Sequence, residues 1–297
     1  MFPIIPAGSA ASFPQNDEGI FGFGEKASGD LATTNLVSNT GVVGSDVAGV
    51  GTARRFLAAT EYGGDKGIFG FGYVSSPAGA SSLSNLVSNA GVVATDTAGV
   101  GTGRAALAGC GYGGDKGIFA FAGYTNLVSN AGVVATDVTQ VGTARTDLAA
   151  CEYGGDKGIF GYGAGYVSMT NLVTNAGVVG TDVTGVGTGR AYLGACGYGE
   201  DKGIFGYGSQ ASAQVTAVSN LVTNAGVVGT DVTGVGTARN KIAACEYGGD
   251  KGIFGFGDTW GNAYVGMSNL VTNAGVIGTD VSAVGTAKAQ HAACSFN

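Results

Sequence analysis

The sequence predicts an all-β protein, a six-bladed β-propeller with four antiparallel strands in each blade. Three observations support this prediction: one motif recurs six times, each copy contains four strand-like runs, and the two chain ends hold complementary parts of one copy. No segment shows the 3.6-residue apolar period of an amphipathic helix. A chain of 297 residues could form two average domains, but stacked repeats share one continuous core.

The repeat has a constant core and one loop of variable length. From the Asn of Asn-Leu-Val to the Gly of Gly-Ile-Phe the spacing is 32 residues in every complete copy, as between Asn35 and Gly67 or Asn220 and Gly252. All length variation follows the Gly-Ile-Phe run. The resulting period of about 41–50 residues is that of a propeller blade.

The copy at 54–97 illustrates the four expected strands in order. The first runs from Arg54 to Tyr62 and meets Gly-Ile-Phe-Gly-Phe-Gly through a Gly-Gly-Asp-Lys turn. After the variable loop, a Ser-Asn-Leu-Val-Ser run meets the last strand through Asn-Ala-Gly, a hairpin signal. Because large side chains would collide where six first strands converge, the Ala-rich first run is expected to be innermost.

The chain ends predict how the propeller closes. The first copy begins with Gly-Ile-Phe-Gly-Phe-Gly at 19–24 and lacks the strand that should precede it, whereas 288–296 is that strand alone. One blade is therefore expected to be shared by both ends. The predicted domain is 17–297, with blades at 288–297 plus 17–47, 54–97, 104–138, 145–183, 190–232 and 239–281.

The repeat resembles the kelch family. A kelch unit opens its innermost strand with an Arg, continues into a strand that ends in glycines, and reaches two outer strands after a variable loop. The opening position is matched by Arg54, Arg104, Arg145, Arg190, Arg239 and Lys288. In place of the adjacent double glycine this chain has Gly-Phe-Gly or Gly-Tyr-Gly, and Val replaces the outer-strand Trp. The sequence of the repeat also resembles that of uncharacterised propeller proteins of tailed bacteriophages and environmental bacteria.

Residues 1–16 precede the first repeat and hold three of the four prolines. They lack the basic start and long apolar centre of a signal peptide. An extended arm that docks on a neighbouring subunit is one interpretation, and a frayed terminus is the other. The apolar side chains available for docking are Phe2, Ile4, Ile5 and Phe13.

The five cysteines occupy one position of the repeat, which Thr60 fills in the first copy. Equivalent atoms on adjacent blades usually lie beyond the reach of a disulfide, about 7 Å between Cα atoms. We therefore expect buried free thiols, with no metal or redox role. The residues are Cys110, Cys151, Cys196, Cys245 and Cys294.

Three repeated polar patterns could carry chemistry, and each has a structural interpretation that we favour. The Gly-Val-Gly-Thr segments resemble phosphate loops, but none precedes a helix, so they are expected to be connectors. Each copy has an Asp eight residues before its Arg or Lys, as in Asp46 and Arg54, which suggests either a ring of cation sites or structural ion pairs and turn caps. The Asp-Lys pairs of the first turn are expected to be solvated.

Little in the sequence indicates an enzyme. The single histidine, His291, lies within the last innermost strand, and no calcium-loop pattern is present. We therefore predict no catalytic residue, cofactor or metal.

Binding, by contrast, is expected on the face where the variable loops emerge, because the opposite face carries near-identical turns. Its aromatic candidates, as sugar platforms or protein anchors, are Trp260, Tyr264, Tyr73, Tyr124 and Tyr166. The competing interpretation is that these residues only pack over the blade edges.

Composition narrows the possible partners. Only 12% of residues are charged and the net charge is −7, which argues against nucleic acid as a partner. No apolar stretch approaches the roughly 18 residues of a membrane helix. We predict a non-enzymatic component of a larger assembly, a phage virion or tail in the first instance. The alternative is a carbohydrate-binding adhesin, and an enzyme is the third class.

Overall fold

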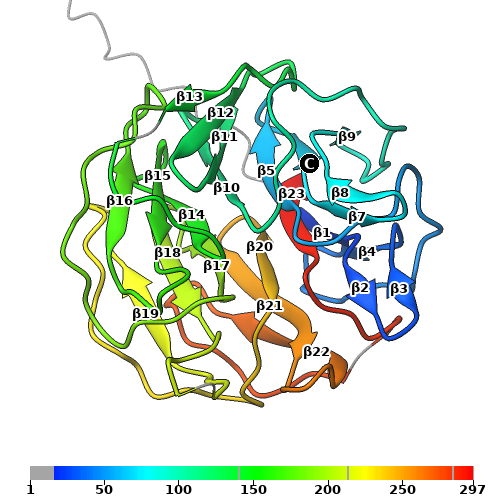
Figure 1. The fold of residues 1–297 in the computed structure, drawn as a ribbon. Coiled ribbons are helices and arrows are strands. Elements are labelled where there is room, and N and C mark those ends of the chain that lie inside the picture. Colours follow the sequence, from blue (N-terminus) through cyan, green and yellow to red (C-terminus); the bar gives the residue numbers. More distant parts are fainter. Residues whose placement is uncertain (1–16, 140, 213, 283, 297) are drawn as a thin grey trace, which may run out of the picture.

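The structure, a computed structural model, describes residues 17–139, 141–212, 214–282 and 284–296. The arm predicted at 1–16 lies outside these ranges. Within them all regular secondary structure is β, in six sheets of three or four strands and two separate two-stranded hairpins. Figure 1 shows the sheets arranged around a common centre, as in a β-propeller. No helix suited to crossing a membrane is found in the described ranges.

Each of the six sheets has its Ala-rich strand nearest the centre, and each such strand contacts its counterparts in the two adjacent sheets. These innermost strands are β5 (Ala58–Tyr62), β10 (Ala108–Tyr112), β14 (Ala149–Tyr153), β17 (Gly194–Tyr198), β20 (Ala243–Tyr247) and β23 (Ala292–Phe296).

The second strand of each sheet is the Gly-Ile-Phe run and the third is the Asn-Leu-Val run. The second strands are β1 (Glu18–Gly22), β6 (Lys66–Gly70), β11 (Lys116–Phe121), β15 (Lys157–Gly161), β18 (Lys202–Gly206) and β21 (Lys251–Asp258). The third strands are β4 (Thr34–Val37), β9 (Ser84–Val87), β12 (Tyr124–Val128), β16 (Thr170–Val173), β19 (Ser219–Val222) and β22 (Tyr264–Val271). The second strands carry the fully buried Phe side chains that pack between sheets.

The prediction of four regular strands in every blade is wrong. Among the described residues only one sheet has a fourth strand, β13 (Val138–Thr139); elsewhere the fourth run makes isolated bridges such as Val87 with Val93 and Ser84 with Thr97. The register shifts by one residue between these two bridges, which interrupts the ladder, and at the shift the Asn85 side chain donates to the Ala94 carbonyl. The equivalent Asn does the same in every repeat.

The two ends of the described chain lie in one sheet. Strand β23 pairs antiparallel with β1, so that Phe296 lies opposite Glu18 and Ala292 opposite Gly22. The sheet order is β23-β1-β4, which places the last strand of the chain innermost. The pairing predicted between the two chain segments is therefore present.

The variable loops add hairpins beyond the repeat. β2 (Glu25–Lys26) pairs with β3 (Gly29–Asp30), and β7 (Tyr73–Ser75) pairs with β8 (Ala78–Ala80). Strands β21 and β22 continue past the repeat core into a longer hairpin that carries Trp260 in its loop. The loops thus differ in structure while the sheets below them are alike.

Candidate functional site

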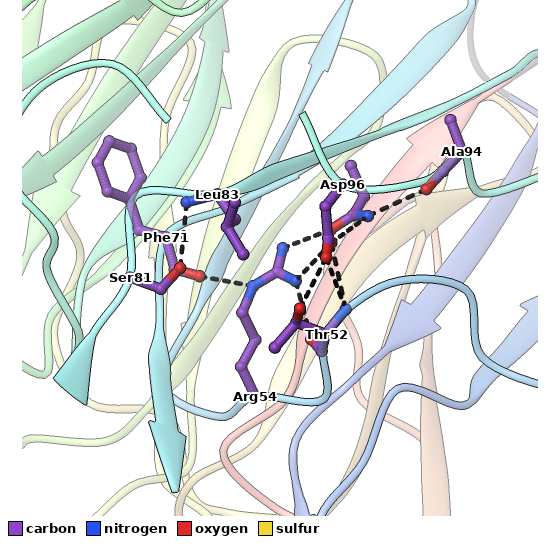
Figure 2. A network of polar contacts seen from close by, with 8 residues as sticks. Thr52, Arg54, Phe71, Ser81, Leu83, Ala94 and Asp96 are labelled. Atoms are coloured by element: carbon purple, nitrogen blue, oxygen red, sulfur yellow. Dashed lines mark hydrogen bonds and ion pairs between the residues drawn. The ribbon is translucent and has the colours of Figure 1, made fainter. Parts of the chain in front are cut away.

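A polar latch joins the start and the end of each sheet. In the sheet that begins with β5, the Arg54 side chain is fully buried. Its Nη2 donates to Asn85 Oδ1 at 2.6 Å, and its Nε donates to the Phe71 carbonyl at 2.7 Å. Asp96 accepts from the Thr52 hydroxyl at 2.7 Å and from Asn85 Nδ2 at 2.9 Å (Figure 2). The latch therefore ties the connector entering the sheet to the outermost segment.

The latch holds its carboxylate ionised. Burial alone would raise the pKa of Asp96, but hydrogen bonds from Thr52 and Asn85 outweigh it and lower the pKa. In Asp137 the same balance lowers the pKa to about 2. Burial lowers the pKa of Arg54 to about 10, opposed by the charge of Asp96.

The Arg and Asp spacing in the sequence suggested the wrong partner. Arg54 contacts Asp96, at 3.7 Å, and not Asp46, which accepts instead from Thr286. The error arose because the seven residues between Asp46 and Arg54 cross from one sheet to the next. Each carboxylate is occupied by Thr, Asn and a cation of its own sheet, which supports the structural interpretation over a ring of cation sites.

The Gly-Val-Gly-Thr segments serve this latch. The Thr52 amide that a phosphate would need donates to Asp96 Oδ2 at 2.9 Å, and equivalent amides donate to the Asp of every other sheet. In the first turn, Asp115 and Lys116 pair with each other at 2.7 Å near the surface. Both patterns are therefore accounted for by local structure.

The five cysteines are buried and free, as predicted. Their sulfur atoms point at glycines on the second strand of the following sheet: an added methyl at Gly158 would lie 2.6 Å from Cys110 Sγ. Burial, and then the charge of Glu152, raises the pKa of the Cys110 thiol. The Gly of Gly-Ile-Phe is thus required by the thiol that packs against it.

Three glutamates near the centre were not singled out in the sequence. Glu61, Glu152 and Glu246 occupy the fourth position of alternate innermost strands, and Gly111, Gly197 and Ser295 occupy it in the others. Glu152 lies over Gly111 of the preceding sheet, where an added methyl would stand 1.4 Å from its Oε1. The Ser295 amide donates to Glu61 Oε1 at 3.3 Å. The small residues make room for the carboxyls.

These glutamates line a central cavity of about 40 Å³, which has room for roughly one water. Burial raises the pKa of Glu246 to about 8, helped by the charge of Glu61. Burial also raises the pKa of Glu61 and of Glu152, and the charge of Glu61 adds to the effect on Glu152. In the described ranges no three acidic, Cys or His side chains are grouped as a metal site requires.

His291 is not placed to act as a base. It is 95% buried between the rings of Phe21 and Phe256, at centroid distances of 5.7 and 5.3 Å, and neither ring nitrogen has a partner among the described residues. Burial, and then the nearby charge of Lys288, lowers its pKa well below the usual value.

The five aromatic candidates fall into separate places. Tyr73 and Tyr264 are brought together through Arg55, which stacks on Tyr73 at 4.9 Å and pairs with Glu25 at 3.4 Å, while the Tyr264 hydroxyl donates to Glu25 at 3.0 Å. These two are structural members of a charged cluster.

The other three candidates are less engaged. Trp260 is 53% exposed and Tyr124 is 45% exposed, the latter under the Arg104 guanidinium at 5.1 Å. Tyr166 borders a shallow hollow of about 530 Å³ in the variable-loop face. Near Tyr166, but outside the lining of the hollow, lie two residues that the sequence analysis did not single out, Asp147 and Tyr192.

Each innermost strand is preceded by a buried Leu, Ile or His, and the residue directly before that one belongs to a set that we call the collar. Asp147 and Tyr192 are two of its six members. Its members have φ between 52° and 64°: Phe56, Ala106, Asp147, Tyr192, Lys241 and Gln290. Each donates its backbone N–H to the carbonyl of the preceding member, at 2.8–3.0 Å, and Phe56 donates to Gln290. Sequence alone gives no signal for the collar, since its side chains share no property.

Comparison with known proteins identifies the fold but no family. No protein-family model and no curated protein matches the chain. A solved structure described as "Structure of YjhT" matches with a TM-score of 0.65 and 11% sequence identity, covering 87% of this chain and 93% of that one. The chain is an all-β protein with a propeller-like fold. In all, 246 chains of solved structures match, and a fold this common does not specify a function.

Proposed function

We propose that the chain forms a six-bladed, kelch-like propeller closed by its own ends. The register of β23 on β1 supports closure, as does the return of the collar hydrogen bonds from Gln290 to Phe56. A latch spans the same two segments, because Lys288 donates to Asn35 at 2.8 Å. Closure of this kind pairs the otherwise free edge of the second strand β1 and leaves a rigid body whose remaining sheet edges are short.

We propose further that this body is a non-enzymatic component of a larger protein assembly. The observation that carries the proposal is the outermost part of each repeat, which we call the rim segments. Apart from Tyr124 and Trp260, every large hydrophobic side chain exposed in the described ranges is a valine of these segments. The rim segments are 42–50, 92–100, 133–141, 178–186, 227–235 and 276–284.

The rim segments expose the same side chain at the same place six times. Their first valine is 60–65% exposed in every copy: Val42, Val92, Val133, Val178, Val227 and Val276. None of the segments contains Lys or Arg, and each has one Asp, held in a latch. Apolar surface of this extent on a sheet edge is a contact surface for another protein.

Burial of these valines would stabilise a contact appreciably. Full burial of one exposed Val contributes roughly 1.5 kcal/mol, so two or three valines at one contact supply several kcal/mol before the cost of association. The weak charge of the surface suits an environment of other proteins. A virion or its tail is the assembly to test first, since the repeat resembles propellers encoded by tailed phages.

The test follows the chain through a density gradient of lysate from the phage or organism that encodes it. We expect the chain to sediment with large particles. Replacing the first rim valine with Thr in all six copies should reduce the particle-bound fraction at least tenfold without lowering the melting temperature. Ala→Ser in the same turns, at Ala90, Ala131, Ala176, Ala225 and Ala274, is the matched control and should have no effect. A wild-type chain found only as free protein would refute the proposal.

A further inference from the structure

One sector of the variable-loop face brings three non-glycine residues of left-handed conformation together. Asp147 and Tyr192 are adjacent collar members, joined by a hydrogen bond from the Tyr192 amide to the Asp147 carbonyl at 3.0 Å. Tyr166 lies in the neighbouring variable loop with φ of 53°. A left-handed backbone favours glycine, and other residues adopt it at a cost in free energy.

The collar geometry requires the left-handed backbone but not the side chains. Glycine would meet the requirement at all six positions, yet none of the six is glycine. In Phe71 and Tyr162 the same left-handed conformation is compensated by burial of the aromatic ring in the core. Asp147, Tyr192 and Tyr166 are only partly buried. These three side chains are therefore not enclosed in the core, and part of each is accessible to a ligand.

The variable loop that carries Tyr166 is pinned beside the collar. Ala164 donates its amide to the Thr146 carbonyl at 2.8 Å, and Arg190 donates to the Val167 carbonyl at 3.3 Å. Residues on both sides of the loop are thereby fixed next to Asp147 and Tyr192. Burial raises the pKa of Tyr192, and the nearby Asp147 and Tyr166 add to the effect.

The hollow of about 530 Å³ continues outward from Tyr166. Ser168 and Thr184 contribute hydroxyls to it, and its wall depends on a glycine: a methyl on Gly189 would lie 1.9 Å from the Tyr166 carbonyl oxygen. Most other repeats have Ala at the position of Gly189. One other repeat also has glycine there, Gly103, where a methyl would lie 2.4 Å from the Ala80 carbonyl oxygen.

We propose that this sector, from Tyr192 and Asp147 through Tyr166 to the hollow, binds a neutral oligosaccharide. The two tyrosine rings would stack on the apolar faces of sugar rings. The Asp147 carboxyl accepts one hydrogen bond, from the Thr146 hydroxyl at 2.9 Å, and so retains acceptor sites for sugar hydroxyls.

The charges near the sector select against acidic sugars. No Lys or Arg lines the hollow, its one charged lining residue is Asp182, and the net charge of the protein is −7. A sialylated or sulfated glycan would find no cation to pair with. The extent of the sector, from the collar to the outer loops, suits several sugar units rather than one.

The test is a glycan array that displays neutral and sialylated glycans, followed by calorimetric titration of the full chain with maltohexaose, cellohexaose and N-acetylchitohexaose. We expect at least one neutral glycan to bind. Tyr166→Ala and Tyr192→Ala should each weaken binding at least tenfold. Tyr166→Phe and Tyr192→Phe keep the ring and should retain most of the affinity. Phe56→Ala is the matched control, because it removes an aromatic ring from the collar position three repeats away from Tyr192.

Melting temperatures distinguish a lost site from a lost fold. If Tyr166→Ala melts with the wild type and binds as well as it does, the proposal is wrong. It is also wrong if only acidic glycans bind, or if no neutral glycan binds the folded chain. The hollow shares lining residues such as Thr184 with the rim segment 178–186, but Val178, the first rim valine, does not line it, and Tyr166 and Tyr192 lie outside the rim segments. The two sets of variants therefore change different side chains, and either proposal can fail without the other.

Discussion

Replacing Glu246 with Gln should change how stability depends on pH. The Glu246 carboxyl lies near the centre against Gly197 and in the field of Glu61, and its pKa is raised from 4.5 to about 8. Gln has nearly the same shape and does not ionise. The variant therefore isolates the contribution of this proton from that of packing.

The sign and the magnitude follow from the two pKa values. Below pH 4.5 the carboxyl is protonated in the folded and the unfolded chain, so it does not affect the free energy of unfolding. Between pH 4.5 and about 8 only the unfolded chain releases the proton, and stability falls by up to about 1.4 kcal/mol per pH unit. Because the central cavity has room for water and the three glutamates interact, the full shift is not realised, and we expect a loss of about 2 kcal/mol relative to the variant by pH 8.

Urea denaturation of both proteins at pH 5, 6.5 and 8 measures this difference. The two should be similarly stable at pH 5, and the variant should be the more stable at pH 8. Glu200→Gln, on an exposed turn, removes the same charge and should leave the wild-type profile unchanged. Parallel profiles for wild type and Glu246→Gln would show that the central carboxyl is ionised in the folded protein and would refute the reasoning.

Three further predictions concern the packing of the repeat. Gly111→Ala should destabilise the fold by about 1–3 kcal/mol, since its methyl would overlap the Glu152 carboxylate, and adding Glu152→Ala should restore most of the loss in urea melts. Asp96→Asn should lower the free energy of unfolding by about 1–3 kcal/mol above pH 4. This loss should shrink as the pH falls below 3.8, because the wild-type carboxyl then loses the benefit of its lowered pKa. Equal losses at pH 3 and pH 7 would contradict this. All five thiols should react with a thiol reagent only on unfolding, and rapid labelling of the native protein would show that they are accessible.

Much of the fold could be predicted because each strand is marked by its own residues. The Gly-Ile-Phe run at 19–24, which has no first strand before it, and the lone first strand at 288–296 led directly to the pairing of β1 with β23. The fourth strand was predicted wrongly because Val-Val-Ala-Thr-Asp-Val has strand composition. The one-residue register shift that interrupts its ladder, where the Asn85 side chain donates to the Ala94 carbonyl, is a feature of pairing that composition does not report.

The sites were less predictable. The alternation of Glu with Gly or Ser at positions 61, 111, 152, 197, 246 and 295 is visible in the sequence and could have indicated a central carboxyl cluster. The partner of Arg54 could not be read from spacing, because nearness in sequence crosses a boundary between sheets. Asp147 and Tyr192 become neighbours only through the collar hydrogen bonds, which depend on backbone geometry rather than on residue type.

The account depends most on closure of the propeller by the last strand, and deletion of 288–297 tests it most directly. The deletion removes β23, the Lys288 contact with Asn35 and one collar position together. We predict that the shortened chain loses the single sharp transition in a urea or thermal melt. A synthetic peptide of 288–297 should restore part of it. A shortened chain that melts sharply near the temperature of the intact protein would contradict closure.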